Sequence, residues 1–195
     1  MKELITIERL KSIFQSKNYQ WNPKLNLIGV RTNDQTPDKF NDYFCLVVDD
    51  KIVGTFECTT DPGVYWLKNP GRINGTAILP PGQYVDSWTI GTHKTYQALV
   101  QCKTLPTWRD ANKNEIVDYS GHVYNDVQGL NIHRGHETWL SKTSKYLLGV
   151  IKIDKYSAAC QVLAFKDNFD MLIACCLGSK KKYFTYTLIV ENDFK

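Results

Sequence analysis

FCLVVDDKIVGTFECTT, residues 44–60, is the stretch that decides the fold class. Residues 44–48 and 52–60 are rich in β-branched and aromatic side chains, and the polar residues 49–51 separate the two runs. Two such runs joined by a short polar turn are typical of a β-hairpin. The stretch therefore predicts two paired strands.

Similar runs occur along most of the chain, usually next to proline or glycine turns. The further predicted strands are residues 76–79, 83–85, 98–103, 129–133, 147–153 and 184–190. Residues 17–43 show no comparable pattern and are expected to form a loop. The fold class is therefore mainly β (a β-rich α+β domain), expected to be a β-sandwich or barrel.

Two helices are expected, one near each end of the chain. Residues 4–16 place apolar side chains at helical spacing and predict a short amphipathic helix that docks on the main body. Residues 168–177 predict a second helix, with Asp167 or Asn168 as its N-cap and Gly178 just after its C-terminus.

Composition restricts the function classes. The 195 residues are 43% hydrophobic and 12% aromatic, which excludes a disordered chain. No apolar run is long enough for a transmembrane helix, and the N-terminus has no apolar signal-peptide core. The net charge of +4 is too small for a dedicated nucleic-acid binder. We expect one domain, residues 1–195, made in the cytoplasm without a signal peptide.

The six cysteines are the strongest intrinsic nucleophiles in the sequence, and their spacing indicates free thiols. Cys160 stands apart because it follows the small residues Ser157, Ala158 and Ala159. A turn of small residues can point adjacent N–H groups at one spot, which would activate a thiol and form an oxyanion hole. The alternative is that Cys160 is a buried core residue, as free cysteines often are.

The sequence gives little support for a metal site. His133 and His136 are not spaced as ligands on one helix face, so a zinc site is not expected. Residues 110–114 read D-x-N-x-N, but a calcium loop would need Gly at Glu115 and Glu at Gly121. A polar turn is the preferred interpretation, and no metal or other cofactor is predicted.

Three segments together carry a family resemblance: residues 75–84 (GTAILPPGQY), 129–134 (GLNIHR) and 157–162 (SAACQV). In this order they resemble the catalytic domain of the L,D-transpeptidases, which are cysteine enzymes of peptidoglycan with a mainly β fold. The resemblance assigns residues 44–165 to the catalytic core and residues 1–20 to an N-terminal helical segment. The whole chain looks like a phage-type branch of the family that contains endolysin-like proteins.

The resemblance implies roles for five catalytic residues. Cys160 would be the nucleophile, His133 the general base, and the backbone carbonyl of Arg134 would orient the imidazole. Ser157 would occupy the Ser/Thr position of the family motif. The backbone N–H groups of Ala159 and Cys160 would form the oxyanion hole.

Substrate binding is expected at Arg72, Tyr84 and Gln161. The sequence also departs from the family pattern: Ala158 replaces a histidine and Ala159 replaces a glycine. The segment between His133 and Cys160 is longer than in most members of the family, so an inserted hairpin is expected over about 136–152. The glycine replacement affects a backbone position that would need positive φ.

The implied reaction is acyl transfer through a thioester on Cys160, with the stem peptide of peptidoglycan as partner. Hydrolysis (carboxypeptidase or endopeptidase, endolysin-like) is favoured over cross-linking. We expect a monomer without nucleic acid or membrane insertion, which acts on the cell wall after phage-mediated release or as a virion component. The alternatives are a non-catalytic wall-binding or phage structural protein, and a metal-dependent hydrolase using His133, His136 and a carboxylate.

Overall fold

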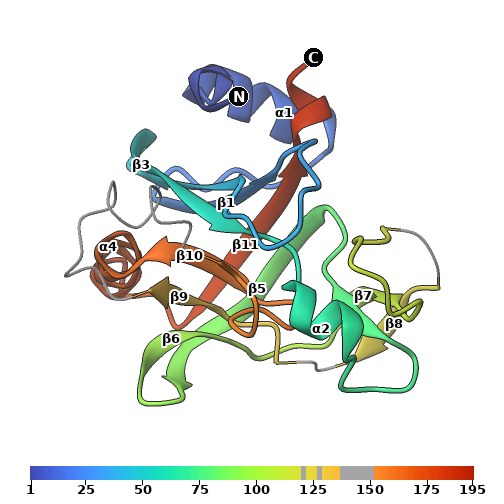
Figure 1. The fold of residues 1–195 in the computed structure, drawn as a ribbon. Coiled ribbons are helices and arrows are strands. Elements are labelled where there is room, and N and C mark those ends of the chain that lie inside the picture. Colours follow the sequence, from blue (N-terminus) through green and yellow to red (C-terminus); the bar gives the residue numbers. More distant parts are fainter. Residues whose placement is uncertain (120–121, 127–128, 137–151) are drawn as a thin grey trace.

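Eight strands close into a barrel in the computed structural model, which describes residues 1–119, 122–126, 129–136 and 152–195 (Figure 1). Around the barrel the order is β1, β11, β5, β6, β9, β10, β3, β2. Their bounds are β1 Leu25–Arg31, β2 Asp42–Val48, β3 Lys51–Thr59, β5 Gly82–His93, β6 Tyr96–Gln101, β9 Ile132–His136, β10 Gln161–Phe165 and β11 Tyr183–Val190. A smaller sheet joins β4 (Thr76–Ile78), β7 (Leu105–Asp110) and β8 (Tyr124–Asp126). The mainly β class is confirmed.

The hairpin predicted from residues 44–60 is β2 and β3. Val48 pairs with Lys51, so Asp49 and Asp50 alone form the turn. Both have positive φ, +48° and +59°. This is the left-handed geometry of a two-residue hairpin turn, and aspartate tolerates it better than most residues.

Aromatic rings fill the inside of the barrel. The ring of Tyr186 stacks on Phe44 at 5.8 Å and meets Trp88 edge-on at 5.5 Å. The Tyr84 ring also meets Trp88 edge-on, at 6.2 Å. The indole N–H of Trp88 donates to the carbonyl of Leu130 at 2.7 Å, so its polar atom is satisfied in the core.

The predicted N-terminal helix is α1 (Ile7–Ser16), capped by the side chain of Thr6. Its buried Leu10, Ile13 and Phe14 pack on the outer side of β1, β2 and β11. The 3₁₀ helices η1 (Lys2–Leu4) and η2 (Glu191–Phe194) lie at the two ends of the chain. In Figure 1 both chain ends lie together beside α1.

The second predicted helix is α4 (Lys166–Gly178), which packs against β6, β9 and β10. It begins directly after Phe165, and no side chain caps it, so the predicted cap at Asp167 or Asn168 is wrong. A third helix, α2 (Val64–Lys68), was not predicted. It packs on β4 through Leu67 and Ile78.

Four strands lie where the sequence predicted none: β1, β7, β8 and β10. β1 occupies part of the expected loop 17–43, and β7 contains a proline. Most of the predicted strand 147–153 and of the expected insertion 136–152 lies outside the described residues.

A buried polar cluster centred on Arg31 and Thr60 ties β1 to the end of β3. The Arg31 Nε donates to the Thr60 hydroxyl at 2.8 Å and lies 3.2 Å from the Asp61 carboxylate. Asp42 accepts the N–H of Thr60 at 2.8 Å. Buried charges are tolerated when paired and hydrogen-bonded in this way.

Candidate functional site

Cys160 and His133 come from two adjacent parallel strands. His133 is opposite Val162 in the β9–β10 ladder, and Cys160 directly precedes β10. Because side chains alternate along a strand, Cys160, Val162 and His133 share one face. Ile132 and Leu163 point into the barrel core, so the shared face is the outer one. The structure thus brings the predicted nucleophile and base to one face of neighbouring strands.

The His133 imidazole is buried and held from several sides. Its Nδ1 lies 2.8 Å from the carbonyl of Arg134 and 3.5 Å from the Tyr96 hydroxyl. His93 stacks on it at 4.3 Å with the rings nearly parallel. The Arg134 carbonyl can only accept a hydrogen bond, so we place the proton on Nδ1 and the lone pair on Nε2.

The environment of His133 keeps the imidazole neutral. Burial lowers the pKa of His133 to about 4, and the nearby His93 and Lys94 act in the same direction. The Nε2 atom is buried and has no hydrogen-bond partner among the described residues. Interactions with the backbone of Arg134 and Tyr156 act in the opposite direction and raise the pKa of His133. A neutral imidazole with its lone pair on Nε2 is chemically a base.

The Cys160 thiol is half-buried, and its sulfur lies 3.5 Å from the carbonyl of Gly129. Burial raises the pKa of Cys160 to about 11, although a backbone hydrogen bond from Asn131 and the charge of Lys94 oppose this. At neutral pH Cys160 is therefore a thiol and His133 a neutral imidazole. The two groups are not a preformed thiolate–imidazolium pair.

The turn that precedes Cys160 is held by Ser157. The Ser157 hydroxyl donates to the carbonyl of Cys160 at 2.9 Å and accepts the N–H of Ala159 at 3.3 Å. The Ser157 carbonyl accepts the N–H of Gly63 at 2.8 Å. The Ala159 N–H, expected in the oxyanion hole, is thus engaged within the turn. To bind an oxyanion it would have to leave Ser157.

Ala159 itself has φ +130°. An L-residue rarely adopts this conformation, whereas glycine adopts it readily. The resemblance to the L,D-transpeptidases places glycine at this position.

Two of the three expected substrate-binding residues lie in the core. The Tyr84 hydroxyl donates to the carbonyl of Pro80, and the ring belongs to the aromatic core. The Gln161 side chain is buried, accepting from Tyr186 at 2.8 Å and donating to Ala159 at 3.3 Å. Neither side chain reaches a surface that a substrate could touch. We therefore assign both to the core, which corrects the sequence-based expectation.

Arg72 is exposed, in the loop between α2 and β4. It lines a cavity together with Arg109 and Ala158. The structure thus places Arg72 beside the turn that ends at Cys160.

Residues of the β5–β6 hairpin were missed by sequence reasoning. His93 ends β5 and stacks on His133, and its Nδ1 lies 3.0 Å from the Asn131 amide nitrogen. The Tyr96 ring lies under the guanidinium of Arg134 at 4.4 Å. No local signal marks these residues, because the pairing of β6 with β9 brings them to the site.

The calcium-like segment is a series of turns. Asp110 accepts the N–H groups of Asn112 and Asp118, and Asn112 accepts that of Asn114. Within the described ranges there is no group of three or more potential metal ligands. The side chain of His136 lies outside the described residues.

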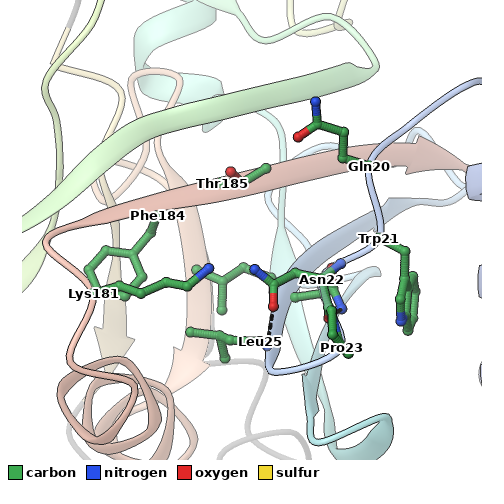
Figure 2. Close-up of a pocket in the computed structure, with 10 residues that line it drawn as sticks. Gln20, Trp21, Asn22, Pro23, Leu25, Lys181, Phe184 and Thr185 are labelled. Carbon is green, nitrogen blue, oxygen red and sulfur yellow. Dashed lines mark hydrogen bonds between the residues drawn. The ribbon is translucent and has the colours of Figure 1, made fainter.

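A cavity of about 150 Å³ lies between the loop before β1 and the beginning of β11 (Figure 2). Its polar walls are occupied by internal bonds: Asn22 accepts from Lys24 at 2.9 Å, and the N–H of Asn22 donates to Asn26 at 3.0 Å. In Figure 2 the Trp21 ring lies at the edge of the group and turns away from Lys181. We interpret this cavity as structural.

Comparisons with known proteins do not establish a family. No protein-family model matches the chain. A stretch of 114 residues is 28% identical to trace amine-associated receptor 1 of Macaca mulatta, covering 56% of this chain and 32% of the receptor, so the chain spans about a third of that protein's length. No helix in the described part of the chain is long and apolar enough to cross a membrane.

Among solved structures, L,D-transpeptidase 1 of Mycobacterium tuberculosis matches 85% of this chain and 62% of its own, at 10% identity. The TM-score is 0.29, which is too low to show a shared fold.

Proposed function

We propose that the protein is a cysteine acyl-transfer enzyme of the L,D-transpeptidase type that hydrolyses peptidoglycan stem peptides. The main support is the placement of Cys160 and His133 on one outer face of two adjacent parallel strands. The hydrogen bond between His133 Nδ1 and the Arg134 carbonyl supports the assignment of Nε2 as the base. The substrate class rests on the sequence resemblance.

In the proposed mechanism the two neutral groups react together. His133 Nε2 accepts the thiol proton while the Cys160 sulfur attacks the peptide carbonyl carbon, forming the acyl–sulfur bond. The departing amine takes the proton from His133. A water molecule then attacks the thioester, giving its proton to His133, and the thiol is restored as the carboxylate product leaves.

The proposed oxyanion donors are the N–H groups of Cys160 and Ala159. A backbone donor aimed at a developing oxyanion typically accounts for about 10²–10³ in rate. The Ala159 N–H first exchanges its bond to Ser157 for one to the substrate. His93 and Tyr96 are proposed as positioning residues, since they contact the imidazole and the residue that orients it.

We further propose that the protein is monomeric, is made in the cytoplasm, and reaches the wall after phage-mediated release or as part of a virion. These proposals rest on the sequence resemblance alone.

The test is mass spectrometry of muropeptides after incubation with purified peptidoglycan of several stem and bridge types. We compare the native protein, Cys160→Ala and His133→Gln with Cys102→Ala, which removes an exposed free thiol outside the candidate site. New fragments with the native protein and Cys102→Ala, but with neither site variant, are the expected result. Incorporation of heavy oxygen from labelled water would identify hydrolysis. An unchanged wall on every substrate would contradict the proposal.

A second candidate is a non-catalytic wall-binding or phage structural protein. Two observations favour it: the raised pKa of Cys160, and the engagement of the Ala159 N–H by Ser157. Alkylation of Cys160 by iodoacetamide in the Cys102→Ala background discriminates between the two, with and without a stem peptide. Slow alkylation that the peptide does not change, together with sedimentation with intact walls, would support the second candidate.

A further inference from the structure

A cavity of about 190 Å³ lies beside the 157–160 turn, between α2 and the sheet of β4 and β7. Figure 1 shows α2 and this sheet on the same side of the barrel. Trp66 of α2, Thr76 of β4 and Ala158 of the turn contribute to its wall. The cavity is thus built from three separate parts of the chain.

Two arginines give this cavity its charge. Arg72 comes from the loop after α2 and Arg109 from β7, and none of the described residues that line the cavity is acidic. Arg109 Nη1 donates to the carbonyl of Gly75 at 3.1 Å, which fixes one edge of its guanidinium. The Thr76 hydroxyl donates to the Trp66 carbonyl, so it is used within the wall. The Arg109 guanidinium also lies 6.0 Å from the centre of the Tyr124 ring. Among the lining residues, the two arginines are the charged side chains that a ligand in the cavity would meet.

The chemistry of this wall suits a carboxylate. A guanidinium presents several N–H donors in one plane and pairs with both oxygens of a carboxylate, which gives both strength and orientation. The half-buried Trp66 supplies an apolar side for the carbon atoms next to the charge. A small cavity with one apolar wall and two cations fits the charged end of a peptide.

The position of the cavity connects it to the candidate site. Ala158 is exposed in the cavity wall and is two residues from Cys160. Two residues of extended chain span at most about 7 Å between Cα atoms. If the carboxylate of a peptide is bound in the cavity, the amide bonds of the next few residues of that peptide can therefore reach the Cys160 sulfur.

We propose that Arg72 and Arg109 bind a free carboxylate of the peptide substrate and so select stem peptides by their charge. The inference rests on the proposed function for the identity of the peptide. Within the site, Arg109 sets the orientation of the carboxylate, and the exposed Arg72 closes over it.

Binding is measured by calorimetry with the Cys160→Ala protein, so that no turnover occurs. The probes are an N-acetylated stem tetrapeptide with free carboxylates and the same peptide with each carboxylate converted to a carboxamide. The free acid should bind about tenfold more tightly or better, because hydrogen bonds between charged groups are worth at least that factor. Comparing the individual amides identifies the carboxylate that is bound.

Arg72→Gln and Arg109→Gln in the same background should each bring the acid-to-amide ratio towards one. Arg9→Gln is the matched control, because it removes the same charge from α1 and should leave the ratio unchanged. Arg109→Lys keeps the charge but loses the planar guanidinium. Its acid-to-amide ratio is expected to lie between those of the parent protein and Arg109→Gln. Thermal unfolding verifies the fold of each variant. Because Arg72 is exposed, Arg72→Gln is expected to fold. This variant therefore tests the inference even if Arg109→Gln does not fold.

Equal affinity for acid and amides, no binding of either, or an unchanged ratio in both arginine variants would overturn the inference. The proposed function fails separately. Charge-selective binding without any wall turnover would contradict the enzyme and leave this site standing. Wall turnover without charge selectivity would contradict this site alone.

Discussion

At the residue scale, Ala159 couples the backbone to the candidate chemistry. With φ +130° it is in a region that costs an L-residue about 1–3 kcal/mol, and it directly precedes Cys160. The bonds of Ser157 to both neighbours hold it there. The strain is therefore stored in the turn that orients the thiol.

Ala159→Gly should relieve this strain. Against this gain, glycine raises the entropy of the unfolded chain, which costs about 0.4–1 kcal/mol, and it removes a buried methyl group. We therefore expect a free energy of unfolding that is unchanged or raised by up to about 1 kcal/mol. Ala158→Gly, at an exposed neighbour without positive φ, should lower it by about 0.5–1 kcal/mol. Urea unfolding of both variants gives the comparison. Equal losses in the two variants would show that the turn is not strained.

The buried His133 should make the fold sensitive to acid. Its pKa is depressed from 6.5 to about 4, so the unfolded chain binds the extra proton between these values. The contribution of His133 to the free energy of unfolding is fully present above about pH 6.5. It is lost as the pH falls towards 4, and the loss amounts to about 3 kcal/mol.

The measurement for His133 is the free energy of unfolding from pH 4 to pH 7 in the native protein and in His133→Gln. The native curve should fall more steeply towards acid, while His122→Gln, at an exposed loop residue, should follow it closely. Parallel curves for the native protein and His133→Gln would mean that His133 is protonated within the fold.

At the element scale, β1 depends on a glycine. A β-carbon at Gly29 would collide with the hydroxyl of Tyr186, which donates to Gln161 inside the barrel. Gly29→Ala should therefore cost about 3 kcal/mol through overpacking. In the Tyr186→Phe background the hydroxyl is absent and the cost should fall by more than 1 kcal/mol. A double-mutant cycle from urea unfolding measures this coupling, and additive losses would contradict the proposed contact.

The elements also show what local sequence can reveal. β2 and β3 were predicted because their pairing and their turn are encoded within seventeen consecutive residues. β1 was missed because both of its sides are covered, by the core and by α1, so its sequence has no alternation. Its pairing with β11 joins residues far apart in the chain, and no short window contains that information.

The same reasoning applies to the site. Small residues before Cys160 marked the turn, and the family resemblance suggested His133. The burial of Tyr84 and Gln161 could not be predicted, because their neighbours come from other strands. His93 was missed for the same reason.

At the scale of the whole molecule, β11 closes the barrel by joining β1 to β5. Removing residues 183–195 should abolish cooperative thermal unfolding, because two strands lose their partners and the aromatic core loses Tyr186. Removing only residues 191–195 should lower the melting temperature but retain the transition. Circular dichroism during heating distinguishes the two. A cooperative transition in the shorter chain would mean that the barrel forms without β11.

The two ends of the chain and the candidate site lie on opposite walls. α1 and η2 cover β1, whereas Cys160 and His133 face outward from β10 and β9, and β1 and β9 are four strands apart around the ring of eight. Lys17 pairs with Asp193 at 2.8 Å, which holds the two ends together. An anchor at either end would therefore present the opposite wall to an insoluble polymer. The protein could therefore be attached to a bead or a scaffold through either chain end and still have its candidate site exposed to a solid substrate.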